Sequence, residues 1–363
     1  MPPEVNNRLD YIDSLRAIAA LLVVWMHVSE SFIRQPGVAA HGTALFDIAR
    51  TFDFGRIGVV AFFAISGFII PQSIKGDLPT GTKKFLIRRF FRLFPAYWLS
   101  IPAAFLVLWW IPGREISFGS VLGNFTMLET VLGYQPLMGH YWTLEVELVF
   151  YTLCLVLFRM GQIHKMYVCA LASAFFVVVF TAASSGLLER WFGFSLEIPG
   201  SLAFMSLNLG VMFWGSCCKH CLLDRADPTK WMLLGASSAL VFFPPLWALG
   251  HITDSNTDNV LRFAGGYGLG MLLFIACVTV LKIRIRALAW LGTLSYSLYL
   301  FHPVVFHGLT QAISSYELTA LQGLHVGAYL VLASLLSIAL AWVVYTLVEK
   351  PAIGIGRKLS ATK

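Results

Sequence analysis

The chain has 363 residues, of which 58% are hydrophobic and 12% charged, and its formal net charge is +7. Soluble proteins carry roughly 25% charged residues, so this composition excludes an ordinary soluble domain. Apolar runs recur along the whole chain, and runs of about 20 residues can cross about 30 Å of hydrocarbon. The basic excess follows the loops between these runs, so it does not indicate nucleic-acid binding.

The apolar runs predict an all-α polytopic membrane protein of about ten helices, because only helices or closed barrels satisfy the backbone in lipid. The predicted spans are 15–34, 57–74, 93–112, 141–158, 166–187, 201–217, 232–250, 262–281, 287–307 and 326–348. The stretch 115–140 is less apolar, and Val121–Leu132 within it predicts an interfacial or re-entrant helix. The loops are short, so we expect 1–363 to be one transmembrane domain without an attached soluble domain.

Basic residues gather in alternate loops, which predicts that both termini lie in the cytoplasm. The predicted cytoplasmic clusters are Arg8 and the basic residues of 75–92, 159–165, 219–230, 282–286 and 350–363. These positions also face the anionic headgroups of membrane lipids. Acidic residues near the N-terminus, with Arg16 and His27 in the first apolar run, argue against a cleaved signal peptide.

The first predicted helix carries Arg16 and His27. A charged side chain in the bilayer costs about 2.5–3.5 kcal/mol, so the pair is a candidate functional site. Their spacing is about three helical turns plus 20°, which places both on one face with a rise of about 16 Å. Alternatively, Arg16 snorkels to the interface and His27 makes a structural hydrogen bond. Asp13, one turn before Arg16, can orient it.

A basic segment with interleaved aromatic residues leads into the third span. It contains Lys83, Lys84, Arg88, Arg89 and Arg92. Such a patch suits a cytosolic ligand with phosphate groups, because guanidinium groups bind phosphate through paired hydrogen bonds. Anchoring to lipid headgroups is the alternative.

The fourth span begins after His140 and Trp142 and contains Glu147. A buried carboxylate needs a partner, and His27 or an arginine is the expected one. The alternative is a protonated, hydrogen-bonded glutamate in the core. Glu145 lies closer to the outer interface, where it can be solvated.

Near the ninth span, hydroxyl groups precede a histidine on one helix face: Ser295, Tyr299 and His302, with Tyr296 beside them. Hydrogen bonding between helices explains this stripe as well as a functional role does. Glu349 is expected to end the last span. The six cysteines lie in or beside predicted helices, so we expect neither a disulfide framework nor a metal site.

Several of these motifs together resemble the acyltransferase-3 family, and the resemblance covers nearly the whole chain. Matching segments are 13–27, with its arginine and histidine; 54–68; 89–92; 142–151; 295–302; and 349–351. Leu148 and Val149 depart from the pattern, because polar residues often follow the glutamate there. The chain also lacks the extracytoplasmic hydrolase-like domain of longer members.

The resemblance implies a multi-pass enzyme of the bacterial inner membrane that moves an acyl group, usually acetyl, from cytosolic acetyl-CoA or another acyl-CoA to a carbohydrate acceptor, which can be lipid-linked. Acyl-CoA is then a co-substrate, and no permanently bound cofactor is expected. The expected catalytic residues are His27, as general base or acyl carrier, and Glu147, which orients His27 or stabilises its charge. The donor-binding residues implied are Arg16, Arg88, Arg89 and Arg92. The acceptor or support residues implied are Asp13, Ser66, His140, Trp142, Tyr296 and His302.

Two other classes of function fit some of these residues. A transporter or exporter of a glycan or small molecule also places polar groups within membrane helices, but it needs no acyl donor. An intramembrane serine protease fits poorly, because Ser66 lies in Ile65-Ser66-Gly67 and not in a Gly-x-Ser-x-Gly motif.

Overall fold

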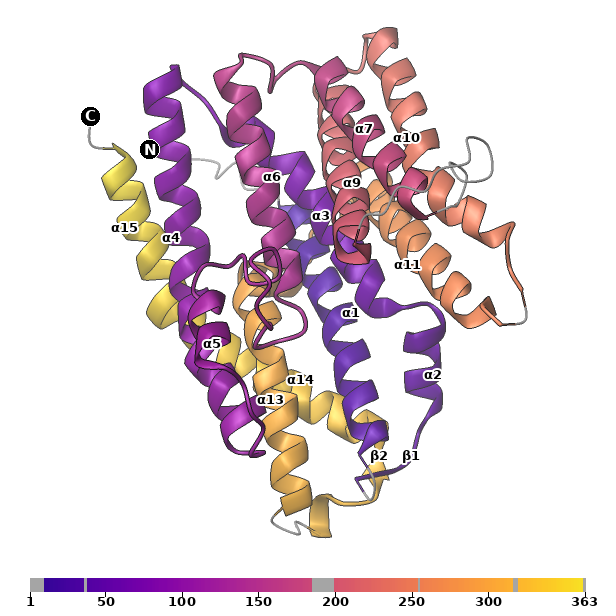
Figure 1. The fold of residues 1–363 in the computed structure, drawn as a ribbon, viewed down its shortest axis with the longest axis vertical. Coiled ribbons are helices and arrows are strands. Elements are labelled where there is room, and N and C mark those ends of the chain that lie inside the picture. Colours follow the sequence, from indigo (N-terminus) through magenta and orange to yellow (C-terminus); the bar gives the residue numbers. More distant parts are fainter. Residues whose placement is uncertain (1–9, 36–37, 185–198, 254, 316–318, 362–363) are drawn as a thin grey trace.

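The computed structural model describes residues 10–35, 38–184, 199–253, 255–315 and 319–361 (Figure 1). Arg8 and the end of the fifth predicted span, 185–187, lie outside these residues. The α-helices are α1 (Asp10–Arg34), α2 (Ala44–Thr51), α3 (Phe54–Ser73), α4 (Leu78–Ala104), α5 (Phe118–Asn124), α6 (Trp142–Arg159), α7 (Met166–Ser184), α9 (Gly200–Leu223), α10 (Pro228–Leu249), α11 (Thr257–Ala276), α12 (Arg286–Thr293), α13 (Ser295–Ser315), α14 (Val326–Val344) and α15 (Lys350–Ala361). Wider π-helical turns are η1 (Phe105–Trp110), η2 (Cys277–Leu281) and η4 (Tyr345–Glu349), and η3 (Thr319–Leu321) is a 3₁₀ turn.

Within the described residues, 8 helical segments are long and apolar enough to cross a membrane: α1, α3, α4 with η1, α7, α9, α10, α11 with η2, and α14 through α15. Two other expected spans correspond to α6 and α13, which are 18 and 21 residues long. Helix α6 differs from the eight in carrying three charged side chains, Glu145, Glu147 and Arg159, and α13 carries His302 and His307. The protein is an all-α polytopic membrane protein, as predicted.

Three predicted helix boundaries are wrong. Helix α4 begins at Leu78, so the basic residues expected before the third span lie within its first turns. The span predicted over 287–307 is divided into α12 and α13 at Leu294. The last helical segment passes through η4 and continues as α15, so Glu349 is not a helix end. Pro351 lacks the N–H that would bond the Leu347 carbonyl, which favours an irregular turn at this point.

The stretch 115–140 contains a shorter helix than predicted, because α5 ends at Asn124 and turns follow. The Asn124 side chain stabilises the turns: its Nδ2 donates to the Ser120 and Gln135 carbonyls, and its Oδ1 accepts from the Leu137 N–H at 2.9 Å. Tyr97 of α4 donates to the Asn124 carbonyl at 2.7 Å. The turns are therefore attached to α4.

A short parallel pair of strands, β1 (Ala39–His41) and β2 (Leu324–His325), was not predicted. It lies near the lower end of the bundle in Figure 1, just beyond the end of α1. The Tyr329 hydroxyl donates to the Val38 carbonyl at 2.6 Å and ties the start of α14 to this pair. The strands thus join an N-terminal segment of the chain to a C-terminal one on that side of the bundle.

Helix α3 is the centre of the bundle and packs against α1, α9 and α11. Its approach to α9 depends on glycine, because a Cβ at Gly67 would lie 1.7 Å from the Met212 carbonyl oxygen. A Cβ at Gly270 of α11 would lie 2.9 Å from the Ile57 oxygen. Small residues therefore allow close helix contacts, as is common in membrane bundles.

Candidate active site

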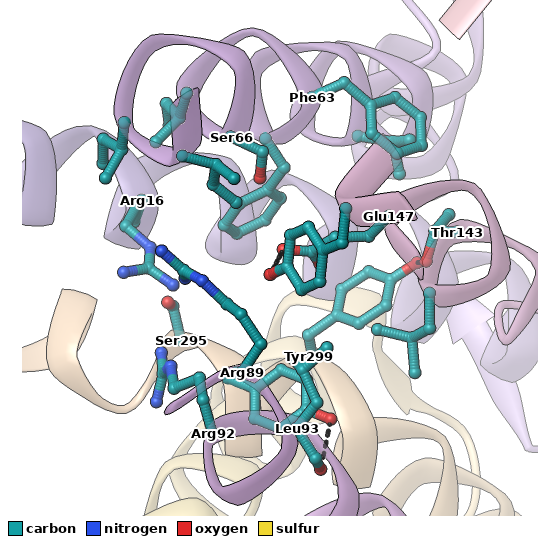
Figure 2. A pocket seen from close by; sticks show the side chains of 18 residues that line it. Arg16, Phe63, Ser66, Arg89, Arg92, Leu93, Thr143, Glu147, Ser295 and Tyr299 are labelled. Carbon is teal, nitrogen blue, oxygen red and sulfur yellow. Dashed lines mark hydrogen bonds between the residues drawn. The ribbon is translucent and has the colours of Figure 1, made fainter. Parts of the chain in front are cut away.

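Helices α1, α3, α4, α6 and α13 surround a cavity of about 120 Å³ (Figure 2). The α3 side of the lining is apolar except for Ser66, and the other polar groups come from the other four helices. The polar lining residues are Arg16, Ser66, Arg89, Arg92, Thr143, Glu147, Tyr151, Ser295, Tyr296 and Tyr299. The cavity therefore brings together residues from five predicted spans.

Three predicted donor-binding arginines, Arg16, Arg89 and Arg92, lie along one side of this cavity (Figure 2). Arg89 donates from Nη2 to the Ser73 hydroxyl at 2.8 Å, and its guanidinium lies 5.3 Å from the ring centroid of Tyr151. These contacts hold Arg89 beside the cavity, and within the described part of the chain no carboxylate pairs with it. The cluster supplies positive charge for an anionic ligand.

Arg92 is held differently, because it forms an ion pair with the buried carboxylate of Glu349. Glu349 also accepts from the Ser297 hydroxyl at 2.5 Å, and the Arg92 guanidinium lies 5.4 Å from the Tyr296 ring centroid. The pair joins α4, α13 and η4 at one point. Glu349 therefore positions Arg92 beside the cavity. We had expected Glu349 at a helix end, and that expectation did not predict this role.

Arg88 and Trp142 are predicted site residues whose side chains are exposed and do not line the cavity. Arg88 is exposed and donates from Nε to Ser360 of α15 at 2.9 Å. Trp142 is 39% exposed, and its ring lies 6.1 Å from that of Phe63. Their positions follow from the helical period, since each lies one residue from a position that lines the cavity.

Asp13 contributes to the close contact between α1 and α12. A Cβ at Gly292 would lie 1.8 Å from the Asp13 carbonyl oxygen, so the two helices touch there through backbone. This contact fixes the start of α1 one turn before Arg16.

Glu147 lines the cavity and accepts from the Tyr151 hydroxyl at 2.5 Å. The contact that we expected between Glu147 and His27 is not among the hydrogen bonds of the described residues, where the partner of His27 is His302. Glu145 is buried, and its carboxylate accepts from the Val131 N–H at 2.8 Å. The interpretation of Glu145 as a solvated residue is therefore wrong.

His27 and His302 form a hydrogen-bonded pair. His27 Nδ1 lies 2.9 Å from His302 Nε2, and the two rings stack with centroids 5.2 Å apart. His302 Nδ1 lies 2.8 Å from the Tyr299 carbonyl oxygen. That carbonyl has no helical partner four residues on, because Pro303 has no N–H. It is therefore free to accept from His302.

This arrangement determines the protons on both rings. The Tyr299 carbonyl can only accept, so the proton of His302 is on Nδ1 and its Nε2 has a lone pair. His302 Nε2 must then accept from His27, which places the His27 proton on Nδ1. The Nε2 of His27 is left with a lone pair. His27 is thus prepared to accept a proton or to act as a nucleophile.

His140 joins this pair, with its ring centroid 5.5 Å from that of His302. It is buried, and its Nε2 has no hydrogen-bond partner among the described residues. A buried polar atom without a partner is uncommon and indicates a group that a bound molecule can satisfy. His27, His140 and His302 therefore form one cluster (called here the histidine cluster).

The histidine cluster lies beside the cavity but not in its lining. Arg16 and His27 both face α13, since Arg16 lines the cavity with Ser295 and His27 bonds His302. Tyr299 and Thr143 line the cavity and also contact the cluster. Neither residue was among the predicted site residues, although Tyr299 belongs to the predicted hydroxyl stripe.

The profile of the acyltransferase-3 family, described as "Acyltransferase domain", matches residues 9–346. Nodulation protein 10 of Rhizobium leguminosarum bv. viciae is 24% identical over 326 residues, which cover 82% of this chain and 83% of that protein. Peptidoglycan O-acetyltransferase OatA of Listeria monocytogenes is 23% identical over 350 residues, 81% of this chain and 49% of that protein. This chain thus spans about half of OatA. No solved structure matches the chain.

The family profile covers α1 through α14, and with them every helix that surrounds the cavity and the histidine cluster. The chain therefore belongs to the acyltransferase-3 family and is a membrane O-acyltransferase.

Proposed function

We propose that this enzyme transfers an acetyl group from acetyl-CoA in the cytosol to a hydroxyl of an extracytoplasmic or lipid-linked carbohydrate. The observation that carries the proposal is a hydrogen-bonded histidine pair directly beside an arginine-lined cavity. The name of one relative, a peptidoglycan O-acetyltransferase, supports a carbohydrate acceptor. The excess of basic residues in alternate loops supports a cytosolic donor. The bacterial relatives support an inner-membrane location.

The cavity suits the acyl end of a small acyl-CoA. Arg16 and Arg89 supply charge for the phosphates, while Arg92 is largely neutralised by Glu349. A cavity of about 150 Å³ can hold a benzene molecule, so about 120 Å³ fits an acetyl group and the end of the pantetheine arm. A long acyl chain would need a larger space. The cavity volume therefore favours acetyl.

The chemistry requires the lone pair on His27 Nε2. As general base, His27 takes the proton of the acceptor hydroxyl while the oxygen attacks the thioester carbonyl. The carbon–sulfur bond breaks, and the imidazolium returns the proton to the CoA sulfur. In the alternative, Nε2 attacks the thioester first and expels CoA thiolate. The acceptor hydroxyl then takes the acetyl group from Nε2, and its proton goes to the thiolate. Trapping labelled acyl-enzyme without acceptor distinguishes the two routes.

The test uses purified protein in proteoliposomes with labelled acetyl-CoA and a carbohydrate acceptor. His27→Ala should abolish acetyl transfer at normal protein levels. Arg89→Ala should raise the KM for acetyl-CoA about 10- to 100-fold, because a hydrogen bond to a charged group contributes about 1.5–3 kcal/mol. Arg88→Ala is the matched control, since this neighbour is exposed on the same helix and should change KM less than about twofold. Retained transfer by His27→Ala, or equal effects of the two arginines, would contradict the proposal.

A further inference from the structure

The Tyr299 side chain lies between the cavity and the histidine cluster. Tyr299 lines the cavity, and its ring centroid lies 4.9 Å from that of His140 and 6.0 Å from that of His302. In Figure 2 it stands with Thr143 on the side of the cavity away from the arginines. A thioester held by those arginines therefore meets the Tyr299 ring before it reaches a histidine.

Two contacts hold the Tyr299 side chain in this position. Its hydroxyl lies 2.8 Å from Thr143 Oγ1 and 3.3 Å from the His140 carbonyl oxygen. Thr143 donates its own proton to the His140 carbonyl at 2.9 Å, so its oxygen accepts from Tyr299. On the other side, the ring centroid of Phe62 lies 6.1 Å from that of Tyr299. The partition is thus made by aromatic rings and closed by hydrogen bonds.

We propose that Tyr299 is a gate between the acyl-CoA cavity and His27. Rotation of its side chain opens the passage for the thioester, and its return separates the two compartments. The role of the gate rests on the proposed function, whereas the position of Tyr299 between the two compartments does not depend on it. While the gate is closed, water at the histidine cluster cannot attack the thioester and release acetate and CoA thiol.

The strength of the closure follows from its hydrogen bonds. One neutral hydrogen bond shifts such an equilibrium about two- to tenfold. Loss of the Thr143 hydroxyl should therefore raise the open fraction about fivefold, whereas loss of the tyrosine ring should remove the partition altogether. A contact of this strength holds the gate closed at rest and still allows opening during turnover.

The first test measures access to position 27 and needs no catalysis. His27→Cys is labelled with 2-sulfonatoethyl methanethiosulfonate, a small anionic thiol reagent, applied from the cytoplasmic side of inside-out vesicles. The native cysteines Cys154, Cys169, Cys217, Cys218, Cys221 and Cys277 are all buried, and the protein with His27 intact gives their background. Adding Tyr299→Ala should accelerate labelling at least about tenfold, and adding Thr143→Val about fivefold.

Tyr267→Ala is the matched control, because Tyr267 is a buried tyrosine bonded to Asn208 at 2.8 Å elsewhere in the bundle. It should leave the labelling rate unchanged. Equal labelling rates with and without Tyr299→Ala would overturn the gate, as would equal acceleration by Tyr267→Ala. Tyr299→Phe, which keeps the ring and loses the hydroxyl, should resemble Thr143→Val and covers the case in which the alanine variant does not fold.

The second test separates the gate from the proposed function. With His27 intact and no acceptor present, Tyr299→Ala should release CoA thiol from acetyl-CoA faster than the unmodified protein does. If the unmodified protein does not transfer acetyl to any carbohydrate, the proposed function fails, but the labelling rates still decide the gate. If transfer occurs and Tyr299→Ala leaves both labelling and thiol release unchanged, only the gate fails.

Discussion

Replacing His302 tests the assignment of the proton on His27. His302→Ala removes the acceptor of the His27 Nδ1–H bond, which is 2.9 Å long. The imidazole of His27 can then carry its proton on either nitrogen, and the form protonated on Nε2 has no lone pair at that nitrogen with which to accept a proton or attack a thioester. Activity should therefore fall although His27 itself is intact.

Two magnitudes bound the expected loss. The net value of one hydrogen bond, about 1 kcal/mol, corresponds to about fivefold in rate. In the serine protease triad, a histidine held in the wrong tautomer costs about 10⁴ in kcat. We expect a fall in kcat of about 10²–10³ for His302→Ala, between these bounds. The KM for acetyl-CoA should change less than about threefold, because Arg16 and Arg89 are untouched.

The assay is steady-state acetyl transfer in proteoliposomes, with kcat and KM determined separately. His302→Gln is the matched variant, because the glutamine side-chain oxygen can still accept a hydrogen bond from His27 Nδ1. This variant should therefore keep part of the kcat that His302→Ala loses. Thermal unfolding of each variant controls for loss of folded protein. A kcat for His302→Ala within about threefold of the unmodified value would refute the tautomer assignment.

Three further predictions concern stability. Pro303→Ala should raise the melting temperature while lowering kcat, because it restores a helical N–H that competes with His302 for the Tyr299 carbonyl; an unchanged kcat would contradict this. Glu349→Ala should cost about 3–5 kcal/mol in chemical unfolding because it leaves Arg92 unpaired, and adding Arg92→Met should recover much of that loss if the pair is isolated. Burial raises the pKa of Glu129 to about 7 from 4.5, so the folded state holds this proton more tightly and the unfolding free energy should fall as pH rises between these values. Glu129→Gln should flatten that dependence in thermal melts from pH 5 to 8, and an equal slope in both proteins would count against it.

The helices themselves were predictable because hydrophobicity alone identifies long membrane spans. Helical geometry also placed Arg16 and His27 on a common face before any neighbour was known. The partners of His27 were not predictable in the same way, since spacing within one helix does not show which helix packs beside it. The sequence offered one usable signal, His302 directly before Pro303, because a proline frees the carbonyl that fixes this histidine.

Glu349 shows a second limit of sequence reasoning. Lys350 and Pro351 follow it, and a charged pair with proline is typical of a helix end. The π-helical turn η4 instead carries the chain onward, and it directs the carboxylate inward to Arg92. Such turns have no clear sequence pattern, so the ion pair could not be found without coordinates. Glu145 was misjudged for a related reason, because the turns that bury it lie in an irregular stretch.

The C-terminal helix α15 has a consequence for engineering this enzyme. It packs along α4, where Gly356 meets Phe91 and Ser360 bonds Arg88. The family profile stops at residue 346, before Glu349 and all of α15. An expression clone trimmed to the profile would therefore lose the ion pair between Arg92 and Glu349 and the packing of α15 against α4. Fusion partners and affinity tags should therefore follow α15 through a spacer, and α15 itself should be kept.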